Sequence, residues 1–273
     1  MKVVFLGDVV GRAGRDAVFK YLPTIKEKLK PDFIFINGEN AAAGFGITKK
    51  IAEEFFDAGV DLITLGNHVF DQKELVAYLS QTSKMIRPLN FPKTTPGKGA
   101  VILTATNGKK ILVINMIARL FMELSDNPFF MIDEYLKSHI LGKTVHSIII
   151  DFHGEATSEK SAFANFLDGR VSAVVGTHSH VPTSDQRILP KGTAFQTDLG
   201  MCGNYDSVIG MVKELAIAKF MNKTPVEKLK PQEGEGMICG SVIHIDDISG
   251  LATKIQPLRL GKGLEETPLE RMI

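Results

Sequence analysis

Residues 3–15, VVFLGDVVGRAGR, contain the first copy of the unit from which we expect the fold to be built. Residues 3–6 are a short apolar run that ends at Gly7 and Asp8, which indicates a buried strand with a carboxylate at its C-terminal end. Apolar residues then recur at helical spacing over residues 15–29, and Pro31 stops that helix. The stretch therefore predicts a strand, a loop and a helix.

The same unit returns twice in the next fifty residues. Residues 33–36 and 61–65 predict two more apolar strands, and Thr48 is placed to cap a helix over residues 49–57. Strands that alternate with helices favour a parallel sheet with helices on its faces. Active sites of such sheets lie beyond the carboxyl ends of the strands.

The remainder of the chain predicts a second sheet within the same domain. Two short strands joined across Asn107 and Gly108 are typical of a hairpin. No repeat or linker divides the chain, so we expect one domain over residues 1–260 and a polar C-terminal tail over residues 261–273, loosely held or docked on a partner. The further expected elements are a loop over 84–99, strands over 100–103, 111–115, 147–151, 171–175, 237–245 and 251–257, and helices over 127–141, 158–167 and 207–222.

Composition excludes several classes of protein. Of the 273 residues, 44% are hydrophobic and 23% are charged, a balance that excludes a disordered, fibrous or disulfide-framework protein. A net charge of +1 gives no reason to expect an extended nucleic-acid footprint. Cys202 and Cys239 fit no zinc spacing and are expected to be reduced thiols. The longest apolar runs are strand-sized, so we expect a cytoplasmic protein without a membrane partner.

Residues with metal-ligand chemistry follow the predicted strands, and four of the seven histidines are among them. Each has an ordinary alternative, since a lone strand-end Asp usually caps a turn and a lone Asn-His pair usually bonds within its loop. Their joint occurrence favours one site. The set is Asp8, Glu39, Asn40, Asn67, His68, His153, His178 and His180, whereas His139, His146 and His244 are expected in surface or core positions.

These residue types suit a site with two metal ions. Two divalent ions roughly 3.5–4 Å apart can clamp the attacking and leaving oxygens of a displacement at phosphorus. Glu39 can supply one oxygen to each ion, and with Asp8 as the other carboxylate the cluster keeps a net charge of about +2, which attracts a phosphate. Mixed nitrogen and oxygen ligands favour Fe, Mn, Zn or Co over Mg.

Several motifs together carry a family resemblance. They are GDVVGRAGR, INGENAAAGFGIT, LGNHVFD, DFHGEATSEK, VVGTHSHVPTSD and TDLGMCG, and they extend from residue 3 to residue 245 or so. In this combination the chain resembles the calcineurin-like metallophosphoesterase superfamily, and within it the bacterial YmdB-type phosphodiesterases. The resemblance implies an α/β fold, a single-domain four-layer α/β/β/α sandwich with the metals at the strand ends.

The resemblance also implies roles for the candidate residues. His68 would be the proton donor beside the cluster. The wider superfamily has a histidine where this chain has Val10, and an aspartate where it has Glu39; Asn40 replaces the missing histidine, as in the narrower family. The implied ligands are Asp8, Asn40 and His180 for the first metal, Asn67, His153 and His178 for the second, and Glu39 as the bridge.

The activity implied by the resemblance is a dinuclear-metal-dependent phosphodiesterase, with iron or manganese as the expected metals. Its expected substrates are 2′,3′-cyclic nucleotides or cyclic AMP. A phosphomonoesterase, or a metal-dependent ligand-sensing or RNA-associated regulator, remains as an alternative, and so does a homo-oligomer.

Four residues outside the ligand set each have two alternative interpretations. Arg12, at the start of a helix, is a candidate contact for a substrate phosphate, although the loop lacks a full nucleotide-binding pattern. Phe45 and Phe70 can stack on a nucleobase or pack in the core, and Cys202 is expected to be structural rather than a nucleophile.

Overall fold

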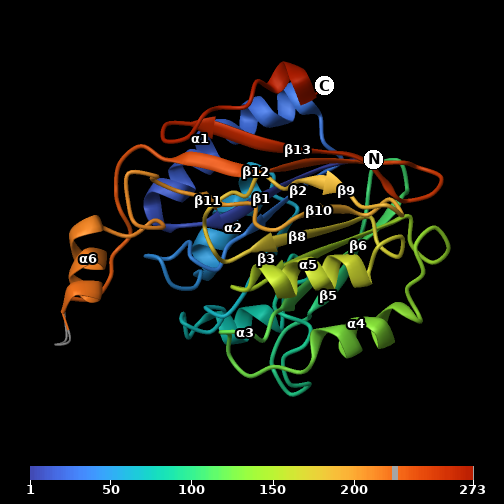
Figure 1. Cartoon of the computed structure of the whole chain (residues 1–273), viewed down its shortest axis with the longest axis horizontal. Coiled ribbons are helices and arrows are strands. Elements are labelled where there is room, and N and C mark those ends of the chain that lie inside the picture. The colour runs from blue at the N-terminus through green and yellow to red at the C-terminus, as the bar shows by residue number, and fades with distance from the viewer. Residues whose placement is uncertain (223–226, 273) are drawn as a thin grey trace.

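The computed structural model, which describes residues 1–222 and 227–272, has two sheets packed face to face with helices on their outer faces (Figure 1). This arrangement is the four-layer α/β/β/α sandwich implied by the sequence, and the prediction of fold class is confirmed. Across the described residues, each helix is too short or too polar to cross a bilayer.

The first sheet is built around the N-terminal strand and has the order β13-β12-β1-β2-β3-β4, with β11 also paired to β1. β1 pairs in parallel with β2 and antiparallel with β12. The elements of this half are β1 (Lys2–Val9), α1 (Gly11–Leu29), β2 (Phe33–Asn37), α2 (Lys49–Ala58), β3 (Leu62–Thr64), α3 (Leu75–Leu79), β4 (Met85–Ile86), β11 (Met201–Cys202), β12 (Met237–Ile245) and β13 (Ala252–Gly261).

The second sheet has the order β5-β6-β7-β8-β10-β9, and its central strands β6, β7 and β8 are parallel. The predicted hairpin forms its edge as the antiparallel pair β5 and β6. The elements of this half are β5 (Ala100–Thr104), β6 (Lys110–Ile117), α4 (Pro128–Leu136), β7 (Ser147–His153), α5 (Thr157–Phe166), β8 (Ala173–Thr177), β9 (Arg187–Ile188) and β10 (Ala194–Gln196).

The alternation of side chains along β1 explains why helices pack on one face of the first sheet and the second sheet packs on the other. Val4 and Leu6 point toward the helices, whereas Val3 and Phe5 point into the core between the two sheets. Successive strand side chains face opposite sides, so a strand buried on both faces reads as a continuous apolar run. Phe5 packs edge-on against Phe35 of the neighbouring strand, with ring centroids 5.7 Å apart.

The helices differ from the sequence prediction in several places. α1 begins at Gly11 and not at residue 15, and α3 was not expected. The helix expected over 127–141 ends at Leu136, because the His139 ring and the Ser138 hydroxyl both bond the Tyr135 carbonyl that the next turn would use. The helix expected over 207–222 is α6 (Lys213–Met221) alone. Residues 207–212 form a turn instead, with Ile209 at a φ of 46°.

Further differences concern strands and the tail. β1 continues through Val9, so Asp8 lies within the strand and not after it, and the short strands β9, β10 and β11 were not expected. β7, which was expected to end at residue 151, continues through His153. A two-residue strand, β4, lies within the segment 84–99 that was expected to be a loop. In the tail, a 3₁₀ turn (Leu269–Met272) buries Leu269 and Met272 against the core under α1. The described part of the tail is therefore docked on its own chain.

Candidate metal centre

The predicted ligands lie at the edge where the carboxyl ends of both sets of parallel strands meet. Asp8 is near the end of β1, and Glu39 and Asn40 lie two and three residues after the end of β2. Asn67 and His68 follow β3, His153 is the last residue of β7, and His178 and His180 follow β8. The two sheets thus contribute to one site from opposite sides.

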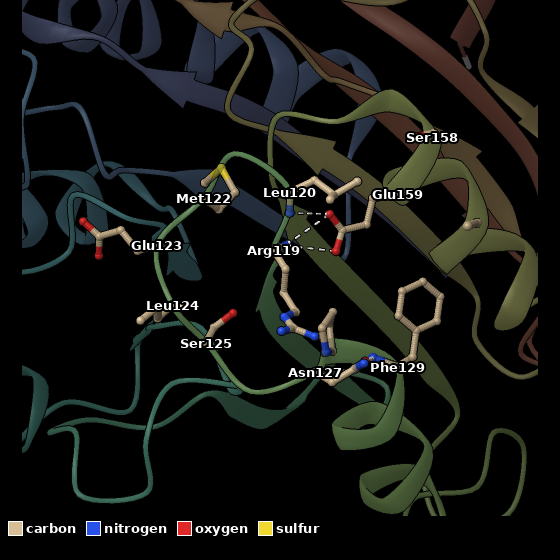
Figure 2. A pocket seen from close by; sticks show the side chains of 12 residues that line it. Arg119, Leu120, Met122, Glu123, Leu124, Ser125, Asn127, Phe129, Ser158 and Glu159 are labelled. Atoms are coloured by element: carbon tan, nitrogen blue, oxygen red, sulfur yellow. Dashed lines mark hydrogen bonds between the residues drawn. The ribbon is translucent and has the colours of Figure 1, made fainter.

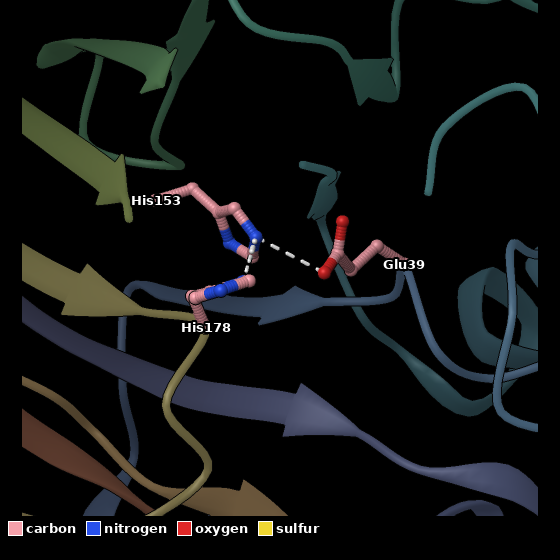
Figure 3. A group of neighbouring side chains, drawn as sticks. All are labelled: Glu39, His153 and His178. Atoms are coloured by element: carbon pink, nitrogen blue, oxygen red, sulfur yellow. Dashed lines mark hydrogen bonds and ion pairs between the residues drawn. The ribbon is translucent and has the colours of Figure 1, made fainter. Parts of the chain in front are cut away.

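Glu39, His153 and His178 form the centre of this site (Figure 3). One donor atom from each lies within 4.8 Å of the others. His153 Nε2 is 3.0 Å from Glu39 Oε1 and 3.1 Å from His178 Nδ1. A carboxylate and two imidazoles at these separations are a chemically suitable start of a transition-metal site.

Asn67 and His68 approach the same centre. The Asn67 side-chain oxygen is 3.0 Å from His153 Nε2, and the His68 backbone N–H donates to Glu39 Oε2 over 3.0 Å. Gly66 makes this approach possible, because a Cβ there would collide with Glu39 Oε2 and with the His153 ring.

Asp8 and Asn40 contribute buried oxygens with no hydrogen-bond partner among the described residues. Asp8 Oδ2 accepts from the His178 backbone N–H at 3.1 Å, but Oδ1 has no partner. The Asn40 amide donates to the Gly44 carbonyl at 2.9 Å, and its Oδ1 also has none. Buried oxygens of this kind are costly unless something satisfies them, and a cation would do so. These residues therefore fit a metal.

His180 lies on the same side as Asp8. Its Nδ1 is 2.8 Å from the Ile209 carbonyl, an arrangement that places the proton on Nδ1 and leaves Nε2 as an acceptor. Ligating histidines commonly make such a bond with their second nitrogen.

A buried chain of hydrogen bonds fixes His153. The Thr177 hydroxyl donates to Asp151 Oδ1 at 2.7 Å, so its oxygen accepts from His153 Nδ1 at 2.8 Å. Asp151 Oδ2 accepts from Thr64 and Asn37. With its proton held on Nδ1, His153 directs Nε2 toward Glu39, as a metal ligand requires.

The four central ionisable groups have strongly shifted pKa values. Burial raises the pKa of Asp8 to about 7. Burial opposes ionisation of Glu39 as well, but the nearby His153 outweighs it and lowers the pKa of Glu39 to about 2. Burial likewise opposes charge on His153, yet Glu39 raises its pKa to about 9. Burial, reinforced by His153, lowers the pKa of His178 to about 3.

The turn that carries His178 and His180 is strained. Their φ angles are 103° and 64°, a region that residues other than glycine rarely adopt. Asp198 secures the turn between them, since its Oδ2 accepts from the Ser179 N–H at 3.0 Å. Lys160, buried with Asp198, donates to the same carboxylate and to the Thr177 carbonyl, each over 2.8 Å.

His68 lies beside the centre and not within the Glu39 cluster. Its Nδ1 is 2.8 Å from Asp71 Oδ2, and its ring contacts Phe45 edge-on with centroids 5.2 Å apart. Phe45 is thus part of the site, whereas Phe70 packs against the core.

An open cleft of ≈ 380 Å³ gives access to the centre. Arg12 does not line it, but belongs to a neighbouring cavity. Glu155 does, with Oε2 3.3 Å from His178 Nε2. The lining residues are Glu39, Asn40, Phe45, His68, Glu155, His178, Ser179, His180, Ile209, Met211 and Leu229.

Sequence reasoning missed several contributors to this site. Glu155 is two residues beyond His153 within a quoted motif, a position that could have suggested it. Lys160 faces the core from α5, and a lysine among the apolar positions of a helix was the available signal. The contribution of Ile209 and Met211 was hidden because their segment was predicted to be helical.

A second hollow shares no lining residue with this cleft (Figure 2). Glu159 accepts hydrogen bonds there from the backbone N–H groups of Arg119 and Leu120 and so fixes the loop that follows β6. Leu124 on the same loop is 98% exposed. None of the candidate metal ligands lines this hollow.

Comparison with known proteins gives a consistent result. The model of the family described as YmdB-like protein matches residues 4–258. A 2′,3′-cyclic-nucleotide 2′-phosphodiesterase of Bacillus subtilis is 48% identical over 256 residues, which cover 94% of this chain and 96% of that protein.

Two solved structures are similar over nearly the whole chain. A hypothetical protein from Thermus thermophilus superposes with a TM-score of 0.89 at 39% identity, covering 96% of this chain and 99% of that one. A structure described as a novel phosphatase, from Mycoplasma pneumoniae, gives a TM-score of 0.88 at 34% identity, with 96% and 93% covered.

Proposed function

Because the chain belongs to the YmdB-like protein family, we propose that it is a phosphoester hydrolase that opens 2′,3′-cyclic nucleotides in a metal-dependent reaction. The observation that carries the proposal is the convergence of Glu39, His153 and His178 beside the unpartnered oxygens of Asp8 and Asn40. The Bacillus subtilis relative, named for this activity, supports the choice of substrate.

We assign two metal ions to the site. Asp8, Asn40 and His180 would hold one ion, and Asn67, His153 and His178 would hold the other, with Glu39 shared between them. Iron or manganese fits these nitrogen and oxygen ligands, as would zinc or cobalt. Bound there, the ions would activate a water molecule and neutralise charge on the phosphoryl oxygens.

The reaction adds one water across a single ester bond. A new P–O bond forms from water, and the bond from phosphorus to the ribose O2′ breaks. The products are a free 2′-hydroxyl and a 3′-phosphomonoester. The O2′ atom must gain a proton as it leaves, because a ribose alkoxide is a poor leaving group.

We assign this proton transfer to His68. Its Nδ1 is occupied by Asp71, so Nε2 is the nitrogen that can serve the leaving oxygen. Its side chain lines the cleft and remains 28% exposed, which gives substrate access to the ring. Asp71 sets the orientation of the ring through this contact.

A phosphomonoesterase is the second candidate, and the similar structure described as a phosphatase favours it. The two activities differ in whether the substrate phosphorus carries one ester bond or two. A metal-dependent sensor would bind nucleotide without turning it over.

One experiment separates these functions. The protein is stripped with chelator, reloaded with Mn²⁺ or Fe²⁺, and assayed on 2′,3′-cyclic AMP, 3′,5′-cyclic AMP and p-nitrophenyl phosphate. We expect metal-dependent turnover of the 2′,3′-cyclic diester well above that of the monoester. Preference for the monoester would favour the phosphatase, and binding without turnover would favour the sensor.

A further inference from the structure

A cavity of ≈ 480 Å³ lies next to the metal cleft and is lined by Arg12, Arg15 and Lys230. Among the described residues, no carboxylate forms an ion pair with Arg12 or Arg15. Lys230 is paired with Glu227. The rest of the lining is Ala43, Val212, Pro231, Gln232 and Glu233.

Within this lining, three cations face one carboxylate, that of Glu233. Arg15 is anchored, since one of its guanidinium nitrogens donates to the Ala41 carbonyl at 2.5 Å. Burial lowers the pKa of Arg15; the charge of Asp16, and more weakly that of Glu54, opposes this, whereas the like charge of Arg12 acts in the same direction as burial. A pocket that gathers two unpaired guanidinium groups is suited to an anion, and arginine matches phosphate geometry well.

The wall between this cavity and the metal cleft is thin. Met211 lines the cleft and the next residue, Val212, lines the cavity; the same holds for Leu229 and Lys230. The two segments are joined, because the Val212 N–H donates to the Lys230 carbonyl at 2.9 Å.

A second connection runs through the loop after β2. Phe45 lines the cleft, whereas Ala43 lines the cavity. The Gly11 N–H donates to the Asn40 carbonyl at 2.9 Å, which ties the start of α1, and hence Arg12, to a residue of the cleft.

Three apolar side chains face the cleft from this wall: Phe45, Met211 and Leu229. The two anion-attracting places are therefore separated by a surface that suits a nucleoside. In an RNA end that carries a 2′,3′-cyclic phosphate, the cyclic phosphate and the preceding 5′-phosphate flank one nucleoside.

We propose that the Arg12–Arg15–Lys230 cavity binds the phosphate on the 5′ side of the nucleotide being opened. The substrate class is then the 2′,3′-cyclic end of an oligonucleotide, in preference to a free mononucleotide. This inference rests on the proposed function for the chemistry at the metal site. It extends the contact by one phosphate, so a net charge of +1 remains compatible with it.

The test compares 2′,3′-cyclic AMP with the dinucleotide ApA that ends in a 2′,3′-cyclic phosphate. We expect kcat/KM to be higher for the dinucleotide. Arg12→Ala should lower the ratio of the two kcat/KM values by about 10- to 100-fold, the effect of a charged hydrogen bond. Arg271→Ala, at an exposed arginine of the tail, is the matched control and should leave the ratio unchanged.

A ratio near one for the unmodified protein, or a ratio that Arg12→Ala leaves unchanged, would overturn the inference while mononucleotide turnover still supports the proposed function. If neither compound is hydrolysed, a binding measurement tests the inference instead. Fluorescence anisotropy with a labelled DNA dinucleotide bearing a 3′-phosphate should then show weaker binding by Arg12→Ala and a salt slope smaller by about 0.7. Equal binding by both proteins would overturn the inference in that case too.

Discussion

Lys160 and Asp198 form a fully buried ion pair, with 2.8 Å between Nζ and Oδ2, directly under the turn that carries His178 and His180. Removing one partner of such a pair leaves an uncompensated buried charge, which typically costs about 3–5 kcal/mol. We therefore expect Lys160→Met to lower the free energy of unfolding of the metal-free protein by about that amount, measured by urea denaturation.

The same pair should matter for metal binding. With Lys160→Met and Asp198→Leu combined, stability should recover in part, because no buried charge remains. The double variant should still bind metal more weakly than the unmodified protein, because the Ser179 N–H loses its acceptor and the strained turn is no longer held. Lys20→Met, in the exposed pair with Glu235, should change neither property. Full metal affinity in the double variant would show that the turn does not depend on Asp198.

Gly66→Ala tests how closely the loop after β3 approaches the centre. The added methyl group would meet both Glu39 and His153, so we expect loss of metal affinity with most of the fold retained. Gly203→Ala is the control, because a Cβ there makes only ordinary contacts. Isothermal titration with Mn²⁺ measures both, and equal affinities would contradict the geometry.

Metal binding should release a proton from His153. Its pKa of about 9 lies above its ordinary value because of Glu39, so His153 is protonated at pH 8 before metal binds. Metal requires the neutral ring, so affinity should rise with pH until about 9, with release of about one proton at pH 8. Calorimetry in buffers of different ionisation enthalpy counts the protons, and no release would contradict this assignment.

The same shift predicts an effect on the stability of the metal-free protein. The folded-state pKa of His153 is raised, so its pairing with Glu39 stabilises fully below the unfolded value of 6.5, and that contribution is lost as pH rises through 9. His153→Gln should remove this part of the pH dependence. Urea denaturation from pH 6 to pH 10 measures it, and an identical profile in the variant would refute the raised pKa.

The role of His68 can be tested by how the loss of kcat in His68→Ala depends on the leaving group. His68→Ala should keep its metals and lose about 10²–10⁴-fold in kcat on a nucleotide diester, the usual contribution of a general acid. The loss should be smaller on a nitrophenyl diester, because nitrophenolate leaves without a proton. Asp71→Asn should show the same pattern more weakly, and His139→Ala should show none.

Equal losses on both diesters would assign His68 to charge stabilisation or substrate positioning. Loss of metal would make it a ligand. Unchanged turnover on both would remove it from the reaction and favour a sensing function.

Residues that follow apolar strands were predictable because local patterns placed them. The apolar runs before Asp8 and Glu39 mark two parallel strands, although β1 itself continues to Val9. Parallel strands bring their carboxyl ends to a common edge. The hairpin of β5 and β6 and the cap at Thr48 were also local, and both are confirmed.

What escaped prediction depends on contacts between distant segments. The Thr177–Asp151 bond that orients His153 joins two strands, and Thr64 and Asn37 complete it from the other sheet. The 207–212 turn has an apolar pattern that suits a helix, but Ile209 takes a left-handed conformation and its carbonyl bonds His180 instead.

Metal content and turnover of Glu39→Gln test the central claim most directly. A carboxamide offers one good ligating oxygen and no charge, so the variant should lose affinity for both ions, while Glu235→Gln and Cys202→Ala should keep the metal content of the unmodified protein. Elemental analysis after reloading with Mn²⁺, with 2′,3′-cyclic AMP hydrolysis on the same samples, gives the answer. We predict two ions per chain in the unmodified protein, and depleted metal with lost turnover in Glu39→Gln. Two ions retained by Glu39→Gln would contradict the shared-carboxylate site.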